Sequence, residues 1–464
     1  MKLTAFKAYD VRGRIPDEIN DDLARAIGRA YAAFVKPENV IVGRDIRLTS
    51  PTLVEALVEG LLESGVSVAD IGLSGTESVY FATAYAHFTS RGFDGGIMVT
   101  ASHNPPDYNG MKFVREGARP LSSDTGLREL AALIRDGNLP SPVVAARRGR
   151  RTYLDTRVQY TEHLLSYVDR SVLRRLKVVV NAGNGGAGPF IDLLEPHLPF
   201  EFIKVHHEPD GRFPNGVPNP MLEGNRHSTI EAIRKSGADI GLAWDGDFDR
   251  CFFFDHQGRF VEGYYLVGLL AQSFLEKEPG SRIVHDPRLT WNTIDIVHRA
   301  GGTPVLCKSG HAFIKQKMRE VDGAYGGEMS AHHYFRRFAY CDSGMIPWLL
   351  VLEQICRSGR SLADLVDERI RMFPCSGELN RKMPDGRMAI KAVQSRFIEQ
   401  AKSVDYTDGL SMEFADWRLN LRSSNTEPLI RLNVESRGSE ALMRQKTDEI
   451  LVFLQELGAE AEGH

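Results

Sequence analysis

Three aspartates alternate along one short segment of the chain, LAWDGDFDRCFFF (242–254). Asp245, Asp247 and Asp249 are each separated by one residue, so in an extended backbone their carboxylates project to one side. Three crowded carboxylates repel one another unless a hard cation neutralises them, and Mg²⁺ prefers oxygen ligands. A calcium loop of the EF-hand kind would need a glutamate where His256 stands, and a solvated acidic turn fits poorly between two apolar runs. The pattern therefore favours a magnesium site.

A serine lies just past another apolar run. In TASHNPPDYNGMKF (100–113), Ser102 follows the run GGIMVT (95–100) and precedes His103. A serine hydroxyl is a poor nucleophile unless a base, a metal or prior phosphorylation assists it. Serine, asparagine and proline are also the residues from which turns are made. This segment alone leaves both interpretations open, a reactive serine and a structural turn.

The elements that must position these side chains form an internal repeat. Three segments open with a β-branched run, a turn rich in Gly, Asp, Asn or Pro, and a stretch of helical periodicity: 41–62, 178–198 and 283–302. Each opening is followed by a second strand candidate, at 66–73, 200–210 and 302–310. After another helical stretch comes a third apolar run, at 95–100, 239–244 and 323–328. Strands that alternate with helices predict right-handed βαβ units and mainly parallel sheets. Because ligands bind beyond the carboxyl ends of such strands, the loops ASHNPP, DGDFDR and EMSAHH are expected to carry function.

The C-terminal part of the chain is organised differently. SMEFADWRLNLRSSNTEPLIRLNVES (411–436) contains two alternating strand-like segments around a polar turn, and a helical tail follows. The predicted fold class is α/β, with three related α/β domains of mixed, mainly parallel sheets and a smaller α+β C-terminal domain around a central cleft. A chain of 464 residues exceeds one hydrophobic core, and the expected domains are 1–150, 151–255, 256–370 and 371–464.

The overall composition argues against several classes of function. A formal net charge of -4 disfavours a broad nucleic-acid-binding surface, so we expect no nucleic-acid partner. The five cysteines are scattered without metal-ligand spacing and are expected to be reduced. The N-terminus has no signal-peptide pattern, and the longest apolar segments, such as 345–352, are shorter than a membrane span of about 20 residues. We therefore expect a cytoplasmic protein without membrane contact.

Four loops in sequence order complete the pattern: TASHNP, DGDFDR, GEMSAHH and RSSNTEP. In register with the threefold repeat, they resemble the four signature loops of the α-D-phosphohexomutase superfamily, and more narrowly those of its bacterial phosphomannomutase/phosphoglucomutase branch. The resemblance covers the chain from AYDVRG (8–13) to RSSNTEP (422–428). It implies an isomerase that moves a phosphate between O6 and O1 of a hexose through a phosphorylated serine. The implied intermediate, a hexose 1,6-bisphosphate, would also serve as activator.

The resemblance assigns residues to the reacting centre. It implies that Ser102 carries the phosphate, and that one Mg²⁺ per chain is bound by Asp245, Asp247, Asp249 and a phosphate oxygen on Ser102. Burial beside Arg12 is expected to lower the pKa of Lys112 and to suit it to proton transfer. The implied catalytic residues are Ser102, Lys112, Arg12, His103 and His311.

The resemblance also assigns the binding of the sugar and of its second phosphate. Glu328 and Ser330 match the loop that reads O3 and O4 of the sugar, and the loop that begins at Arg422 matches the one that holds the non-reacting phosphate. Where related enzymes carry a lysine in a strand-end loop of the third domain, this sequence has Pro287 and Arg288. The four expected domains thus supply, in order, the phosphoserine, the metal site, the sugar-recognition loop and the distal phosphate site. The implied substrate-binding residues are Tyr9, Arg250, Arg288, Glu328, Ser330, His332, Arg422, Ser424, Asn425 and Thr426.

The choice of hexose depends on the stretch GEMSAHHYFRRFAYCDSGMIPW (327–348). It resembles phosphomannomutases that feed GDP-mannose synthesis, so mannose 6-phosphate and mannose 1-phosphate are the expected substrates, with glucose phosphates as further ones. The alternatives are phosphoglucomutase as the main activity and a metal-dependent sugar-phosphate phosphatase. Phosphoglucosamine mutase is disfavoured, because that branch usually has glutamine where Met329 stands. A monomer or a homodimer is expected.

Overall fold

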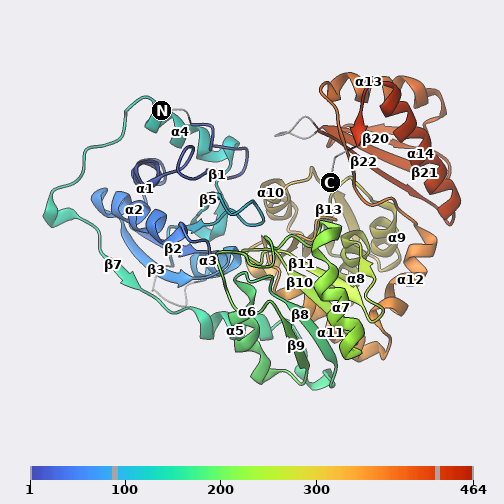
Figure 1. Cartoon of the computed structure of the whole chain (residues 1–464), viewed down its shortest axis with the longest axis horizontal. Helices are drawn as coiled ribbons and strands as arrows, with labels where there is room; N and C mark the ends of the chain where they lie inside the picture. The colour runs from blue at the N-terminus through green and yellow to red at the C-terminus, as the bar shows by residue number, and fades with distance from the viewer. Residues whose placement is uncertain (1–2, 86–91, 424–428, 462–464) are drawn as a thin grey trace. The chain divides into compact units, whose positions relative to one another are not determined.

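The structure of the chain is a computed structural model that describes residues 3–85, 92–423 and 429–461. The chain divides into two compact units, Met1–Phe260 with His332–Gly359 and Val261–Ala331 with Arg360–His464. In both units, helices alternate with strands along most of the chain (Figure 1).

The first unit begins with a mixed sheet of strand order β1-β5-β4-β2-β3-β7. Strands β4, β2, β3 and β7 run parallel to one another, and β5 is antiparallel to both its neighbours. Helix α1 begins where the Asn20 side chain accepts a hydrogen bond from the Leu23 amide at 3.0 Å, and it packs against α2 (Figure 1). The elements of this part are β1 (Val11–Arg14), α1 (Asp21–Val35), β2 (Asn39–Arg44), α2 (Ser50–Glu63), β3 (Ser67–Leu73), α3 (Thr76–Ala84), β4 (Gly95–Val99), β5 (Tyr108–Arg115), β6 (Arg119–Pro120), α4 (Arg128–Arg135) and β7 (Arg151–Tyr153).

A second sheet in the first unit contains the neighbouring strands β11-β10-β8-β9. Strand β8 is parallel to β9 and to β10, and β11 returns antiparallel to β10. The segment His332–Gly359 adds an antiparallel strand pair and a helix, whose buried Trp348 meets Trp244 of β10 edge to face. The elements are α5 (Arg157–Leu165), β8 (Lys177–Asn181), α6 (Ala187–Leu194), β9 (Glu201–Val205), α7 (His227–Ser236), β10 (Ile240–Trp244), β11 (Cys251–Asp255), β16 (His333–Phe335), β17 (Cys341–Asp342) and α11 (Ile346–Ser358).

The second unit begins with a third sheet of the same design. Strand β13 is parallel to β14 on one side and to β15 on the other, and α8 packs against α9. The elements are α8 (Gly263–Lys277), β13 (Arg282–His285), α9 (Trp291–Arg299), β14 (Thr303–Leu306), α10 (His311–Val321), β15 (Tyr325–Gly327) and α12 (Leu362–Met372).

One arrangement of strands therefore recurs in the three sheets. In each, the first strand of the repeat lies between the second and the third and is parallel to both: β2 between β3 and β4, β8 between β9 and β10, β13 between β14 and β15. The predicted internal repeat is confirmed. The strand predicted over 200–210 was too long, because His206 takes a left-handed conformation (φ 43°) directly after β9 ends.

The C-terminal part of the second unit is a separate antiparallel sheet of order β19-β20-β21-β22-β18-β23. The two alternating segments predicted here are β21 and β22, with Trp417 opposite Ser436. Helices α13 and α14 pack on this sheet around a core that includes Phe397 and Ile450 (Figure 1). The predicted α+β C-terminal domain is confirmed. Its elements are β18 (Leu379–Lys382), α13 (Gly386–Phe397), β19 (Ser403–Asp405), β20 (Leu410–Glu413), β21 (Trp417–Ser423), β22 (Leu429–Ser436), α14 (Glu440–Glu456) and β23 (Glu460–Ala461).

The length and polarity of the helices decide whether one of them could span a membrane. Among the residues that the structure describes, no helix is both long enough and apolar enough to cross a bilayer.

Candidate active site

Ser102 lies in the loop that follows β4 and is almost completely buried. It is 4% exposed, and its backbone takes a left-handed conformation (φ 49°) that non-glycine residues rarely adopt. The Ser102 hydroxyl donates a hydrogen bond to Oδ2 of Asp245 at 2.7 Å. Gly246 permits this approach, because a Cβ atom there would lie 2.5 Å from the Ser102 carbonyl oxygen. The structure therefore brings the predicted serine and the first predicted aspartate into direct contact.

The three aspartates converge through a turn and not along an extended segment. Residues 245–250 form the loop between the antiparallel strands β10 and β11, and Phe248 has a φ of 47°. The expectation of an extended backbone was therefore wrong, because the chain reverses here to start the next strand. One carboxylate oxygen from each of Asp245, Asp247 and Asp249 nevertheless lies within 4.8 Å of the other two.

Lys112, on β5, lies between two of these aspartates. Its Nζ donates to Oδ2 of Asp247 at 2.7 Å and to Oδ2 of Asp249 at 2.5 Å. Burial by itself lowers the pKa of Lys112, but the two carboxylates outweigh burial and raise this pKa above its usual value. The expected lowering was wrong, because it took account of burial and of Arg12 but not of the two carboxylates.

His103 and Arg250 complete the contacts of the serine and the first aspartate. Arg250 donates to Oδ2 of Asp245 through Nε at 3.0 Å and through Nη2 at 2.9 Å, and Nη2 also donates to Nδ1 of His103 at 2.5 Å. Burial, followed by the charge of Arg250, lowers the pKa of His103 well below its usual value. His103 is therefore neutral, with its proton on Nε2, and its Nδ1 lies 3.1 Å from the hydroxyl oxygen of Ser102.

Residues 245–250, called the acidic loop below, have side chains that could bind a divalent cation. Oδ1 of Asp247 is buried, and no residue in the described part of the chain donates a hydrogen bond to it. Burial and the charge of Asp247 raise the pKa of Asp249 well above its usual value, whereas Lys112 outweighs burial and lowers the pKa of Asp247, so one ammonium group offsets only part of the negative charge. Lys112 uses Oδ2 of both residues, so Oδ1 of each is the oxygen that could bind a metal. Hard oxygen ligands of this kind suit Mg²⁺.

Three other predicted residues belong to the first unit. Arg12 donates from Nη1 to the side-chain oxygen of Asn104, in the serine loop, at 2.7 Å. Tyr9 is half-buried near the start of β1. His332 lies close to the acidic loop, with its Nε2 at 3.8 Å from Oδ1 of Asp249. Their roles stay predictions.

In the second unit, Arg288 connects two strand-end loops of the third repeat. It is buried, and its Nη2 donates to Oδ2 of Asp286 at 2.7 Å and to the hydroxyl of Ser330 at 3.2 Å. Oε1 of Glu328 lies 3.5 Å from the same nitrogen and accepts a hydrogen bond from the Gly310 amide at 2.8 Å. The departure from lysine at this position therefore places a guanidinium group beside both predicted sugar-reading residues.

Arg422, on β21, shares a carboxylate with Arg288. Its Nη2 donates to Oε2 of Glu378 at 2.8 Å, and Nη1 of Arg288 lies 3.5 Å from the same oxygen. Arg431 approaches the other carboxylate oxygen at 3.5 Å. Burial raises the pKa of Glu378, but the three arginines outweigh burial and lower it. The remaining predicted residues of this loop lie outside the described residues: Ser424, Asn425 and Thr426.

His311 is the first residue of α10. Its Nδ1 lies 3.4 Å from Nζ of Lys315, one turn further along the helix. Its predicted place near the bound sugar stays a prediction.

Three residues of these sites were not predicted. Arg47 holds the serine loop, Asp286 orients a neighbouring arginine, and Glu378 neutralises an arginine cluster. The sequence contains a signal for the first two, since Asp-x-Arg-Leu-Thr occurs at 45–49 after β2 and again at 286–290 after β13. Glu378 belongs to no such repeated pattern.

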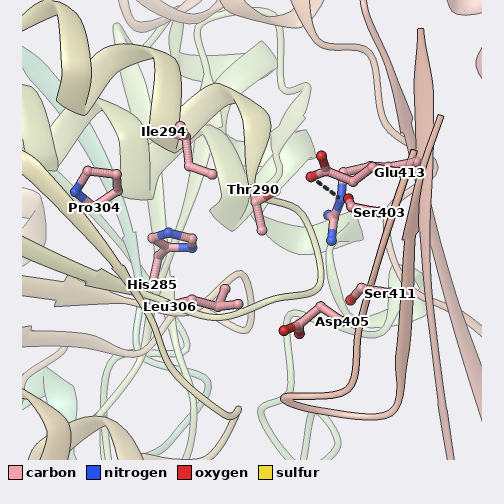
Figure 2. Close-up of a pocket in the computed structure, with 10 residues that line it drawn as sticks. His285, Thr290, Ile294, Pro304, Leu306, Ser403, Asp405, Ser411 and Glu413 are labelled. Atoms are coloured by element: carbon pink, nitrogen blue, oxygen red, sulfur yellow. Dashed lines mark ion pairs between the residues drawn. The ribbon is translucent and has the colours of Figure 1, made fainter. Parts of the chain in front are cut away.

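A pocket of about 190 Å³ lies elsewhere in the second unit (Figure 2). Residues of the third repeat, including Ile294, Pro304 and Leu306, form one side, and Asp405 and Glu413 of the C-terminal sheet lie on the other. None of the predicted site residues lines it. Its volume is below the roughly 300 Å³ at which small-molecule sites usually begin, so we assign it no ligand.

The fold defines a class of protein. A threefold α/β repeat and an antiparallel C-terminal domain form the architecture of the phosphohexomutases, and in this chain a buried serine lies beside three carboxylates. Family models of phosphoglucomutase/phosphomannomutase match alpha/beta/alpha domain I at 3–139, domain II at 158–258, domain III at 262–373 and the C-terminal domain at 378–452. The chain belongs to the phosphoglucomutase/phosphomannomutase family.

Individual relatives are similar over nearly their whole length. The chain is 62% identical over 450 residues to a protein named "Phosphohexose mutases" from Xanthomonas campestris pv. campestris (strain B100), with 97% of this chain and 99% of that protein covered. It is 57% identical over 460 residues to a phosphomannomutase of Escherichia coli (strain K12), with 98% and 100% covered. A crystal structure of a phosphoglucomutase/phosphomannomutase family protein from Burkholderia thailandensis is 33% identical, with a TM-score of 0.89 and 98% of each chain covered. The predicted superfamily and fold class are confirmed.

Proposed function

We propose that this chain is a magnesium-dependent phosphomannomutase that interconverts mannose 6-phosphate and mannose 1-phosphate and also acts on glucose phosphates. The observation that carries the proposal is the 2.7 Å hydrogen bond from the Ser102 hydroxyl to Asp245, beside two further buried carboxylates. The names of close relatives support the same activity. A cytoplasmic location and a supply of mannose 1-phosphate for GDP-mannose synthesis belong to the same proposal.

Ser102 carries the transferred phosphate in this mechanism. In the first half-reaction, the bond between phosphorus and Oγ of Ser102 breaks while a bond to O1 or O6 of a hexose monophosphate forms, which gives a hexose 1,6-bisphosphate. In the second half-reaction, the other phosphate returns to Ser102. The proton that the sugar hydroxyl loses in the first half is regained by the sugar oxygen released in the second, so the cycle consumes no proton. A free hexose 1,6-bisphosphate can phosphorylate an unphosphorylated Ser102 and would therefore act as an activator.

The aspartates would hold the metal ion. Asp245, Asp247 and Asp249 would bind Mg²⁺ together with an oxygen of the phosphate on Ser102. When bound, the ion withdraws negative charge from the phosphoryl group during transfer. Nζ of Lys112 donates hydrogen bonds to Asp247 and Asp249, so as an ammonium group Lys112 supplies positive charge near the reacting phosphate.

The second unit would bind the rest of the substrate. Glu328 and Ser330 would accept and donate hydrogen bonds to the O3 and O4 hydroxyls, with Arg288 fixing their positions. Arg422 would bind the non-reacting phosphate through its guanidinium group. Mannose and glucose differ only at C2, so these contacts accept both sugars.

Initial rates on mannose 1-phosphate, glucose 1-phosphate and glucosamine 1-phosphate test the proposal. Hexose 6-phosphate and inorganic phosphate are measured in the same reactions, with Ser102→Ala as the matched control. We expect hexose 6-phosphate as the product, formed fastest from mannose 1-phosphate, and no activity above background in the variant. Release of inorganic phosphate without isomerisation would contradict the proposal, and a higher rate on glucose 1-phosphate would contradict the preference for mannose.

A further inference from the structure

Arg47 lies just past β2, buried beneath the loop that carries Ser102. Its side chain is 1% exposed. Nη2 donates to the carbonyl oxygens of Ser102 at 2.9 Å and Asn104 at 2.5 Å, and Nη1 donates to those of Pro105 at 2.7 Å and Tyr108 at 2.9 Å. The two terminal nitrogens of the guanidinium group therefore bind one loop at four points along its backbone.

The guanidinium group is itself held in one orientation. The Arg47 amide donates to Oδ1 of Asp45 at 3.0 Å, and Nε lies 3.4 Å from Oδ2 of the same carboxylate. The hydroxyl of Ser50 donates to Asp45 at 2.6 Å and fixes the carboxylate in turn. The ring of Phe213, from the second repeat, lies 5.2 Å from the centre of the guanidinium group. Arg47 thus has little freedom to release the loop.

The third repeat builds the same turn. The Arg288 amide donates to Oδ1 of Asp286 at 2.9 Å, as the Arg47 amide does to Asp45. Arg288 also reaches the loop that follows the third strand of its own repeat, at Ser330. In both repeats, therefore, an arginine at the end of the first strand binds the functional loop at the end of the third.

The second repeat lacks this arginine and makes the contact with its backbone. Gly183 stands in the corresponding turn, and its amide donates to Oδ1 of Asn181 at 2.9 Å. The Gly186 amide donates directly to the carbonyl oxygen of Gly246, in the acidic loop, at 3.1 Å. The loop after the third strand is therefore held by an arginine side chain in the first and third repeats and by a backbone amide in the second.

We propose that Arg47 is a positioning residue for phosphoryl transfer, which holds the 102–108 loop so that the Ser102 hydroxyl points at the acidic loop. The inference rests on the proposed phosphoserine mechanism. Ser102 has a left-handed backbone (φ 49°), a strained conformation that persists only where neighbouring contacts determine it. The four carbonyl contacts of Arg47 supply that constraint. A misplacement of about 1 Å at reacting atoms lowers rates by about 10²-fold.

Arg47→Lys is the informative substitution. Lysine keeps the charge and most of the buried stem, but its three hydrogens radiate from one nitrogen and cannot reach carbonyl oxygens spread over 102–108. Arg29→Lys is the matched control, because within the described residues Arg29 donates to one carbonyl oxygen, that of Pro140, at 2.6 Å. Both variants are compared with the wild-type chain for thermal unfolding before any rate is measured.

The test is the rate at which the dephosphorylated chain takes up phosphate from a hexose 1,6-bisphosphate in the presence of Mg²⁺. Quenched samples are analysed by intact mass, which gives both the rate and the final extent of phosphorylation. For Arg47→Lys we expect full extent at a rate lower by about 10²-fold, with KM for mannose 1-phosphate within about threefold of wild type. Arg29→Lys should match the wild type in rate and extent.

Four results would overturn the inference. A wild-type rate in folded Arg47→Lys would show that the loop is positioned without the guanidinium group. A wild-type rate with reduced extent, or a variant that does not fold, would show that Arg47 serves stability and not positioning. If the wild-type chain takes up no phosphate at residue 102, the proposed function itself fails and this inference fails with it.

Discussion

The buried carboxylates of the two units differ in how completely cations offset their burial. In the first unit, Lys112 outweighs burial and lowers the pKa of Asp247, but burial and neighbouring aspartates still raise the pKa of Asp249. In the second unit, burial acts in the same direction on Asp286 and Glu378, yet arginine partners outweigh it and lower the pKa of both. The first site is short of positive charge, and the second contains enough guanidinium groups to keep its carboxylates ionised. The difference agrees with the proposal that the first site binds a cation and the second an anion.

Removing charge from the acidic site should have the largest effect. Asp247→Asn withdraws a carboxylate oxygen that has no hydrogen-bond donor in the described part of the chain, and it weakens the ion pair with Lys112. We expect kcat on mannose 1-phosphate to fall about 10³-fold, with a higher Mg²⁺ concentration at half-maximal rate. Steady-state rates over a series of Mg²⁺ concentrations measure both quantities.

Asp192→Asn is the matched control for this prediction, because it removes an exposed carboxylate that pairs with Lys204. Its rate and its Mg²⁺ dependence should equal those of the wild type. An Asp247→Asn variant with an unchanged Mg²⁺ dependence would contradict the proposal that the site in the first unit binds the cation.

Changing the arginine site should have a smaller effect, and mainly on binding. Arg422→Lys keeps one positive charge but loses the fork that donates to Glu378 and that would bind a phosphate. We expect KM for mannose 1-phosphate to rise about tenfold and kcat to change by less than about threefold. Arg444→Lys, at an exposed position that pairs with Glu440, is the control. A lower kcat at constant KM would contradict the assignment of this site to the anion.

Substitution of Glu77 should have the smallest effect on activity of the changes considered, and its effect on stability should depend on pH. Glu77 is fully buried on α3, and burial raises its pKa to about 8. Between about pH 4.5 and about pH 8 the carboxyl group is therefore protonated in the folded chain and ionised in the unfolded chain. Relative to Glu77→Gln, the free energy of unfolding of the wild type should be highest below this window and fall by about 1.4 kcal/mol per pH unit across it.

Urea unfolding at several pH values measures this difference, and Glu129→Gln, at an exposed position on α4, is the control. Activity of Glu77→Gln should stay within about twofold of wild type, because no hydrogen bond from Glu77 to the predicted site residues is found in the described part of the chain. A stability difference that does not change with pH would contradict the raised pKa.

The repeat made most of the fold predictable from the sequence. Each of its copies buries a β-branched strand between helices, and this requirement leaves a periodicity that can be read without coordinates. The aspartate cluster was predictable for a similar reason, since three adjacent carboxylates need neutralisation whatever the backbone does. The shape of the loop 245–250 was not, because alternation along the sequence does not distinguish a strand from a turn.

Long-range contacts were beyond the sequence pattern. The pKa of Lys112 depends on Asp247, which is 135 positions away, and on Asp249, which is 137 positions away. Glu378 matters only because Arg422 and Arg288 meet at its carboxylate. A local pattern of residue types does not predict which distant side chains will form ion pairs with the same buried carboxylate.

The most direct test of the central claim is the mass of the chain after incubation with a hexose 1,6-bisphosphate and Mg²⁺. The account predicts one added phosphate, mapped by peptide analysis to Ser102, and no added phosphate and no mutase activity in Ser102→Ala. A phosphate on another residue, or a Ser102→Ala variant that isomerises mannose 1-phosphate at the wild-type rate, would contradict it.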